Sequence, residues 1–249
     1  MPLSAFALML LSVVLVGLLS LVGISLVSLK KSALDSVVFV LVGLAVGALF
    51  GDCFLHLLPE AYQDPQAAFT SSLLVLCGIL LFFILENFLH WRHEHAHGHG
   101  EIHPYGYLNL IADMAHNFID GLLIGGSYLA SVTLGIATTT AVTLHEIPHE
   151  FGNFGILVKA GFSRRKALFL NFLTGLTAIL GGLTAWSVGT ATGTFHHALI
   201  PLTAGSFIYI AGSDLVPELQ KETGAVRSLL QFLSILGGIG IMLLLRIFE

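Results

Sequence analysis

Long apolar runs separated by short polar stretches dominate the chain. A membrane-spanning helix needs about 20 mostly apolar residues, and eight segments meet this requirement. They are residues 3–29, 34–58, 69–91, 107–129, 132–158, 165–189, 199–216 and 226–248. The pattern therefore predicts an all-α, polytopic membrane protein with eight transmembrane helices, in which residues 1–249 form a single transmembrane domain.

The composition agrees with this pattern. Of the 249 residues, 55% are hydrophobic and only 10% are charged, and the mean hydropathy is +0.90. A soluble domain has about 25% charged residues, so this chain could not cover a water-exposed surface. We expect no nucleic-acid partner, because the net charge is −5 and no basic tract is present. The two cysteines, Cys53 and Cys77, form no CxxC motif, which argues against a thiolate zinc site.

The basic residues indicate how the helices are oriented. Lysine and arginine concentrate in cytoplasmic loops, and nine of the ten in this chain fall in the first, third, fifth and seventh predicted loops. These nine are Lys30, Lys31, Arg92, Lys159, Arg164, Arg165, Lys166, Lys221 and Arg227. We therefore expect the odd-numbered loops in the cytoplasm and both termini outside it. The protein would be a multi-pass protein of a cell membrane, either a bacterial inner membrane or a eukaryotic plasma or organelle membrane.

The third predicted loop, residues 93–103, is rich in histidine. Histidines alternate with other residues through most of it, and two of those others are glycines. Short His-rich tracts are typical of metal binding, and glycine-containing segments are flexible. We interpret this loop as a flexible cytoplasmic metal-binding segment, the alternative being a polar linker.

The fourth and fifth helices contain the residues that suggest a function. His116 and Asp120 lie four apart in the fourth helix, so they share one face. His145 and His149 repeat this spacing in the fifth helix. Asn117 adjoins the first pair, and a second stripe in the fifth helix is formed by Glu146 and Glu150.

Ionisable side chains inside a bilayer cost several kcal/mol each, so this cluster needs partners. His116, Asp120, His145 and His149 could surround one ion, and imidazoles with a carboxylate suit Zn²⁺. Fe²⁺, Mn²⁺ and Cd²⁺ remain possible because affinity order alone does not set selectivity. A second, adjacent position could be formed by Asn117, Glu146, His149 and Glu150. The alternative is that these buried polar residues only hold the helices together.

Two further helices end in a similar way. The second predicted helix contains a run of polar residues that closes with Pro-Glu, and so does the seventh. These residues are Asp52, His56 and Glu60 in the second helix and Asp214 and Glu218 in the seventh. They are either additional ligands along a metal pathway or interfacial hydrogen-bonding groups.

The motifs in the fourth and fifth helices resemble those of the ZIP (Zrt/Irt-like) family of divalent metal transporters. The motif that begins at His116 reads HNFIDG, and the one that begins at His145 reads HEIPHE, like the HExPHE signature of one ZIP subfamily. The resemblance covers nearly the whole chain. It implies eight spans, a His-rich loop between the third and fourth, and import of metal toward the cytoplasm through helices two, four, five and seven.

The family resemblance also implies roles for the site residues. His116, Asp120, His145 and His149 match a first, transport-essential metal position, and His145 is typical of zinc-preferring members. Asn117, Glu146 and His149 match a second position. Some members add a Glu from the sixth helix, which this chain lacks between residues 168 and 187. The resemblance further implies a homodimer, and no cofactor other than the transported ion.

The main alternative function is that of an intramembrane zinc metalloprotease. Residues 145–149 satisfy the HExxH pattern, with two zinc ligands and Glu146 as general base. Pro148 would distort the helix that aligns the base, and His116 would close the coordination position that catalysis needs open. We therefore expect a transporter rather than an enzyme. A lipid-amide hydrolase and a zinc sensor are weaker alternatives.

Overall fold

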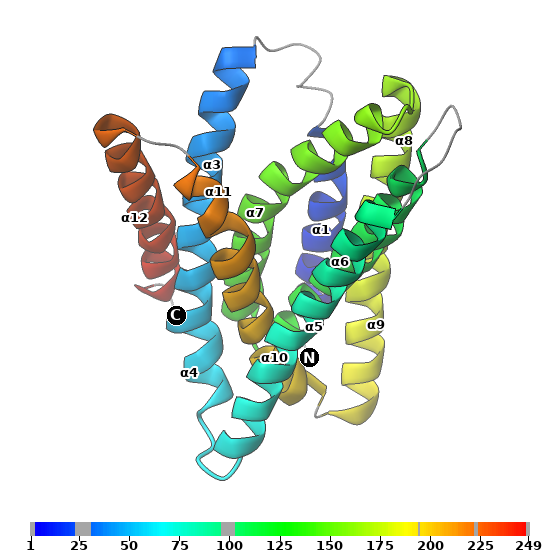
Figure 1. Cartoon of the computed structure of the whole chain (residues 1–249). Helices are drawn as coiled ribbons and strands as arrows, with labels where there is room; N and C mark the ends of the chain where they lie inside the picture. Colours follow the sequence, from blue (N-terminus) through cyan, green and yellow to red (C-terminus); the bar gives the residue numbers. More distant parts are fainter. Residues whose placement is uncertain (1–2, 23–30, 96–102, 194, 222–223, 248–249) are drawn as a thin grey trace.

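The computed structural model describes residues 3–22, 31–95, 103–193, 195–221 and 224–247, and these form helices without a strand. Eight helical segments run through the molecule (Figure 1). They are α1 (Leu3–Leu19) with η1 (Ser20–Val22); α3 (Lys31–Asp52) with η2 (Cys53–Leu57) and α4 (Leu58–Ala61); α5 (Ala68–His95); α6 (Pro104–Ala130); α7 (Val132–Lys159); α8 (Arg164–Gly175) with α9 (Thr177–Thr192); α10 (Phe195–Tyr209) with η3 (Ile210–Leu215) and α11 (Val216–Gln220); and α12 (Ala225–Ile247).

The helices confirm a polytopic helical membrane protein. Among the described residues, six segments are long and apolar enough to cross a membrane. The other two are α6 and α7, which are 27 and 28 residues long and contain the polar residues of the predicted site. Their lower hydropathy therefore reflects these polar side chains rather than insufficient length. The predicted segment 3–29 is helical to Val22, and the remainder of it lies outside the described residues.

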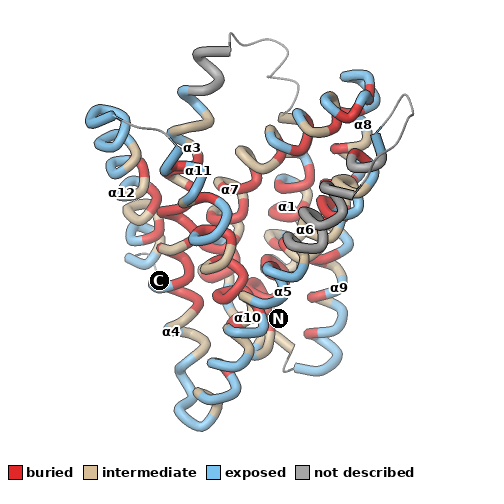
Figure 2. The backbone as a smooth tube through the Cα atoms, in the orientation of Figure 1, coloured by how far each residue is buried: buried red, intermediate tan, exposed pale blue. Residues whose placement is uncertain are grey.

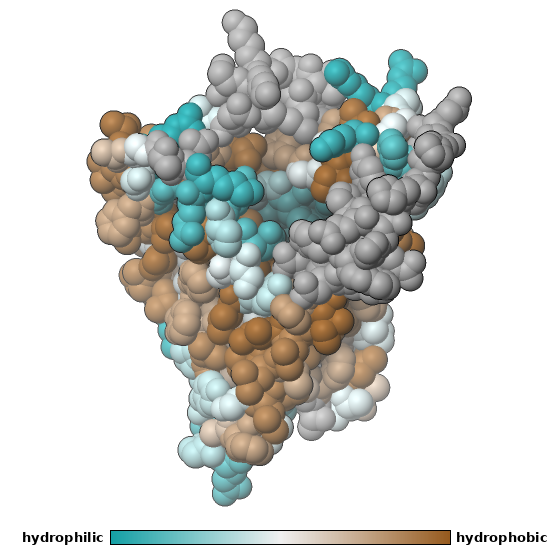
Figure 3. Space-filling view, viewed as in Figure 1, coloured by the Kyte–Doolittle hydropathy of each residue, from teal (hydrophilic) through white to brown (hydrophobic). Residues whose placement is uncertain are grey.

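An even number of crossings brings the described ends of α1 and α12 to the same side of the bundle (Figure 1). Buried residues gather between the helices, whereas exposed ones lie on the outer faces and at the ends (Figure 2). The exposed outer positions include large apolar side chains such as Leu80 on α5 and Leu244 on α12. Figure 3 shows the resulting apolar surface below a more hydrophilic upper end. Such a surface fits a lipid environment.

Two helical segments contain a π-helical stretch at equivalent places. The stretch η2 ends two residues before Pro59, and η3 ends two residues before Pro217. Proline has no N–H and clashes with the carbonyl of the preceding turn, so a wider turn accommodates it. The sequence likeness between the two Pro-Glu endings is therefore matched by the same backbone irregularity, a feature that is frequent at functional sites.

Small residues bring α6 against α9. A Cβ atom added at Gly121 would collide with the carbonyl oxygen of Ala178, and one at Gly181 would collide with that of Phe118. Such reciprocal contacts let helix backbones approach closely within a membrane. They hold the turn of α6 that contains the predicted ligands against a neighbouring helix.

The predicted His-rich loop lies mostly outside the described residues, which resume at His103. His103 is the extended residue that precedes α6, and Pro104 occupies the first turn of that helix. Proline is favoured there because the first N–H groups of a helix have no intrahelical partner. The proposed metal-binding role of residues 93–103 therefore stays a prediction.

Candidate metal site

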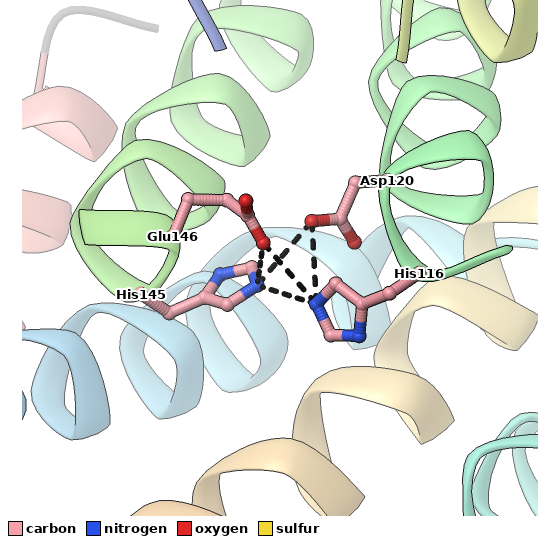
Figure 4. Close-up of side chains that lie close together, drawn as sticks. All are labelled: His116, Asp120, His145 and Glu146. Carbon is pink, nitrogen blue, oxygen red and sulfur yellow. Dashed lines mark hydrogen bonds and ion pairs between the residues drawn. The ribbon is translucent and has the colours of Figure 1, made fainter. Parts of the chain in front are cut away.

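Four predicted site residues converge between α6 and α7. His116 and Asp120 come from α6, and His145 and Glu146 come from α7 (Figure 4). One potential ligand atom from each residue lies within 4.8 Å of every other. Four donors at such separations can surround one metal ion.

The closest approaches in this cluster cross from one helix to the other. The Nε2 atom of His116 lies 3.2 Å from Glu146 Oε1, and Nε2 of His145 lies 3.3 Å from Asp120 Oδ2 (Figure 4). The two Nε2 atoms are 3.4 Å apart. Both imidazole edges therefore face the same small space as the two carboxylates.

The cluster is almost fully enclosed. The side chains of Asp120 and Glu146 are 0% exposed, that of His145 is 1% exposed and that of His116 is 12% exposed. Apart from the imidazoles, no described residue hydrogen-bonds to either carboxylate. Two buried carboxylates without other donors form an electron-rich site, and a divalent cation bound there would neutralise their charge. Two imidazoles and two carboxylates are a suitable ligand set for Zn²⁺.

The local sequence explains how α7 presents its candidate ligands. Ser131 begins the helix, and its side-chain oxygen accepts a hydrogen bond from the backbone N–H of Leu134 at 3.1 Å. Farther along, the Nδ1 atom of His145 lies 3.3 Å from the carbonyl oxygen of Ala141. A carbonyl can only accept, so a proton on Nδ1 would satisfy this contact and leave the Nε2 lone pair available to a metal ion. Helix α7 continues through Pro148.

His149 lies beside the cluster rather than within it. Its ring stacks on that of His116, with centroids 4.2 Å apart and planes inclined by 26°. Its Nδ1 atom is 3.5 Å from Glu146 Oε1, and its side chain is 26% exposed. The sequence pattern assigned His149 to the first metal position and Glu146 to the second, whereas the structure groups Glu146 with His116, Asp120 and His145.

Asn117 and Glu150 are buried near the cluster, but they contact other partners. The Nδ2 atom of Asn117 donates to Asp113 Oδ1 at 3.1 Å, and Glu150 Oε2 accepts from Asn171 Nδ2 at 2.5 Å. One oxygen of each, Asn117 Oδ1 and Glu150 Oε1, is buried without a hydrogen-bonding partner. Both residues therefore retain a donor oxygen that a second ion could use.

Sequence reasoning gave no role to the polar residues that support these ligands. They are Asp113 on α6, Asn153 on α7, and Asn171 and Thr174 on α8. A usable signal was present, because Asn171 and Thr174 lie three apart and so share one face of the sixth predicted span. Both side chains are buried in that span, where a polar group needs a partner.

The other polar positions are divided between buried and exposed environments. Asp52 Oδ1 lies 3.2 Å from His56 Nδ1, both side chains are buried, and Thr138 on α7 donates to Asp52 Oδ2 at 3.1 Å. Asp214 and Glu218, by contrast, are exposed. The two similar Pro-Glu endings therefore lie in different environments.

Comparison with known proteins identifies the family. The sequence profile described as "ZIP Zinc transporter" matches residues 3–106 and 92–246. The chain belongs to the ZIP zinc transporter family. The predicted membership of the ZIP family is thereby confirmed at the level of the family, and the comparisons give no support to the metalloprotease alternative.

Individual relatives of this ZIP family member cover most of its length. It is 40% identical over 223 residues to zinc transporter ZIP13 of Pongo abelii, with 84% of this chain and 66% of the relative covered. It is 32% identical over 308 residues to zinc transporter SLC39A7 of Rattus norvegicus, covering 86% and 66%. Zinc transporter ZIP13 of Danio rerio is 34% identical over 262 residues, covering 83% and 75%. The chain thus spans about two thirds of the length of the first two relatives.

Proposed function

We propose that this protein transports Zn²⁺ across a membrane through the cluster formed by His116, Asp120, His145 and Glu146. The observation that supports this function most strongly is the convergence of four ligand-type side chains, nearly sealed from solvent, between two helices of a membrane bundle. An ionisable cluster at that depth is costly unless its members satisfy one another or a bound ion. The similarity to relatives named as zinc transporters supports the same cargo.

Transport is proposed to run toward the cytoplasm. Exposure at the site rises along α7, from 1% at His145 to 26% at His149, and Lys159 ends this helix in the fifth loop. Asp214 is exposed although it lies within a candidate membrane span, as expected if it lines a water-filled path. Figure 3 shows a hollow at this end of the molecule with hydrophilic side chains in and beside it. The basic odd-numbered loops predict that this end is cytoplasmic.

The opposite end of the path is closed in this conformation. Asp52 and His56 are buried, and Thr138, to which Asp52 is hydrogen-bonded, precedes His145 by two turns of α7. A metal ion arriving from outside would therefore need this packing to open. We infer a cycle in which the site faces one side at a time, with the inner side accessible here.

The three remaining predicted site residues are proposed to form a neighbouring position. His149 shares Glu146 with the main cluster, and Asn117 and Glu150 each keep one buried oxygen without a hydrogen bond. An ion leaving the cluster could therefore keep Glu146 as a ligand while it exchanges His116 for His149. Fe²⁺, Mn²⁺ and Cd²⁺ remain alternative cargoes to be compared with Zn²⁺.

Uptake of Zn²⁺ into proteoliposomes tests the proposed function. Wild-type protein should accumulate Zn²⁺, and His145→Ala should abolish accumulation because it removes a fully buried ligand. Matched vesicles containing Tyr107→Ala, an exposed residue on α6 outside the site, control for reconstitution. Wild-type vesicles that accumulate no Zn²⁺, Fe²⁺, Mn²⁺ or Cd²⁺ while the protein remains folded would refute transport.

A homodimer is also proposed, on the basis of the family resemblance. The large exposed apolar side chains of α5 and α12 are available to pack against a second copy within the bilayer. The mass of the protein in lipid nanodiscs measures the oligomeric state directly. A mass of one chain at all protein-to-lipid ratios would contradict the proposal.

A further inference from the structure

Asp113 lies outside the four-residue cluster, yet its buried carboxylate accepts hydrogen bonds from three other side chains. It is on α6, one turn before His116, and only 2% of the residue is exposed. Thr174 Oγ1 on α8 donates to its Oδ2 at 2.5 Å, and Asn153 Nδ2 on α7 donates to its Oδ1 at 2.6 Å. A single side chain therefore links three helices around the site.

The same carboxylate determines how Asn117 presents its amide group. Asn117 Nδ2 donates both to Asp113 Oδ1 and to the Asp113 backbone oxygen, each at 3.1 Å. Both partners can only accept, so the amide nitrogen must face them. The oxygen Oδ1 then points away from Asp113, and it is buried without a hydrogen-bonding partner. A metal ion is a partner that such an oxygen could bind.

Asp113 also acts on His149 through Asn153. The Nδ2 atom of Asn153 that donates to Asp113 lies 3.4 Å from His149 Nδ1, and Asp113 Oδ1 itself lies 4.0 Å from that atom. One face of the imidazole is covered by the stacked ring of His116. The His149 ring is thus in contact both with His116 of the main cluster and with the Asp113–Asn153 pair.

We propose that Asp113 is a positioning residue for metal transport, which orients the Asn117 oxygen and the His149 ring toward an ion that leaves the main cluster. This inference rests on the proposed transport function. The two oxygens of Asp113 accept hydrogen bonds from different groups. Oδ1 accepts from Asn117 and Asn153, which adjoin the site, whereas Oδ2 accepts from Thr174 of α8. Positioning and helix linkage can therefore be separated by mutation.

The test compares Asp113→Asn with Thr174→Val. Asp113→Asn keeps the shape but removes the negative charge and replaces one acceptor oxygen by a donor, so the hydrogen bonds that Asn117 and Asn153 donate to this side chain are weakened. Supporting groups around metal ligands typically change metal affinity by about 10- to 100-fold when mutated, and we expect the KM for Zn²⁺ to rise by at least about tenfold. Thr174→Val removes the hydrogen bonds of Thr174 Oγ1 to Asp113 Oδ2 and to the Asn171 carbonyl oxygen, both away from Asn117 and His149. It should therefore lower the melting temperature while leaving KM unchanged.

A double variant shows whether Asp113 acts through Asn117. If it does, the rise in KM for Asp113→Asn combined with Asn117→Ala will be smaller than the product of the two single effects. If Asp113→Asn fails to fold, Asn153→Ala breaks the link to His149 with the carboxylate intact and should raise KM in the same direction. Unchanged KM in the folded Asp113 and Asn153 variants, with melting temperatures lowered as in Thr174→Val, would overturn the proposal.

Direct Zn²⁺ binding to the detergent-solubilised full chain distinguishes a failure of the transport proposal from a failure of the positioning role of Asp113. Wild-type protein that binds Zn²⁺ but moves none would end the transport proposal, and the comparison of affinities between Asp113→Asn and Thr174→Val would still decide the role of Asp113. If instead the wild type transports Zn²⁺ and the two variants have the same Zn²⁺ affinity and the same KM, the transport proposal stands. The positioning role of Asp113 is then refuted.

Discussion

Glu146 Oε1 on α7 lies 3.2 Å from His116 Nε2 on α6, and this contact gives the candidate site its second carboxylate. The spacing of ligands along α7 had favoured His145 and His149 as the pair that faces α6. In the structure, His145 and the residue directly after it face α6 together, and His149 stacks beside them. The cluster therefore holds two carboxylates and two imidazoles, a more negatively charged set than the sequence pattern implied.

This geometry predicts different consequences for the two glutamates of α7. Glu146→Gln removes a buried charge within the cluster, so Zn²⁺ affinity should fall by more than about tenfold. Loss of a group that only supports a metal ligand already lowers affinity by about tenfold or more. Glu150→Gln leaves the cluster intact, because Glu150 is bonded to Asn171, and its effect should be smaller. Zn²⁺ binding by isothermal titration measures both, and a larger loss for Glu150→Gln would contradict the assignment.

The two histidines of α7 should also differ. His145 is inside the cluster and 1% exposed, whereas His149 is 26% exposed beside it. We expect His145→Ala to abolish Zn²⁺ uptake and His149→Ala to slow it while initial binding persists. Uptake and binding measured on the same preparations separate these effects. Loss of binding in His149→Ala equal to that in His145→Ala would show that His149 belongs to the first position, as the family resemblance implies.

Transport should weaken as the medium is acidified. Imidazole and carboxylate ligands bind metal in their deprotonated forms, so protons compete with Zn²⁺ for the cluster and metal binding releases protons. Affinity should therefore be highest near neutral pH and fall below about pH 6, where free histidine becomes protonated. Equilibrium binding of Zn²⁺ measured across this range tests the expectation. Affinity that is constant from about pH 5 to pH 7.5 would argue against a histidine-containing site.

Packing at Gly121 should be intolerant of a larger side chain. A Cβ atom there would collide with the carbonyl oxygen of Ala178, and overpacking typically costs about 1–3 kcal/mol. Gly121→Ala should lower the melting temperature and displace the turn that contains Asp120. Gly155→Ala on α7 is the matched control, because nothing lies within 4 Å of the added Cβ. Equal melting temperatures for the two variants would show that α6 and α9 can move apart without a loss of stability.

The orientation can be tested by labelling single cysteines in a chain whose own cysteines are replaced by serine. Lys159→Cys lies at the end of α7 in the fifth loop, and Gln66→Cys lies in the exposed second loop. A membrane-impermeant thiol reagent should reach Lys159→Cys only from the cytoplasmic side and Gln66→Cys only from the other. The reverse pattern would invert the proposed topology and the direction inferred from it.

The sequence alone determined the helices and the residue types of the site. Eight apolar runs of spanning length can satisfy their backbone groups in a bilayer only as helices. Their positions agree with the described helices to within a few residues, and the part of the first run after Val22 lies outside the described residues. The repeated i, i+4 spacing showed which turns of the fourth and fifth spans could bind metal. These features are local, because helix formation and shared helix faces depend on neighbours along the chain.

Only the tertiary structure decided which ligands meet. Whether Glu146 or His149 completes the cluster depends on the rotation of α7 about its axis relative to α6, and that rotation is set by packing between helices. The contact of Gly121 with Ala178 and the hydrogen bonds of Asp113 to Asn153 and Thr174 join residues 40 to 61 positions apart. Spacing along one helix cannot reveal such contacts, because they arise from the arrangement of several helices in space.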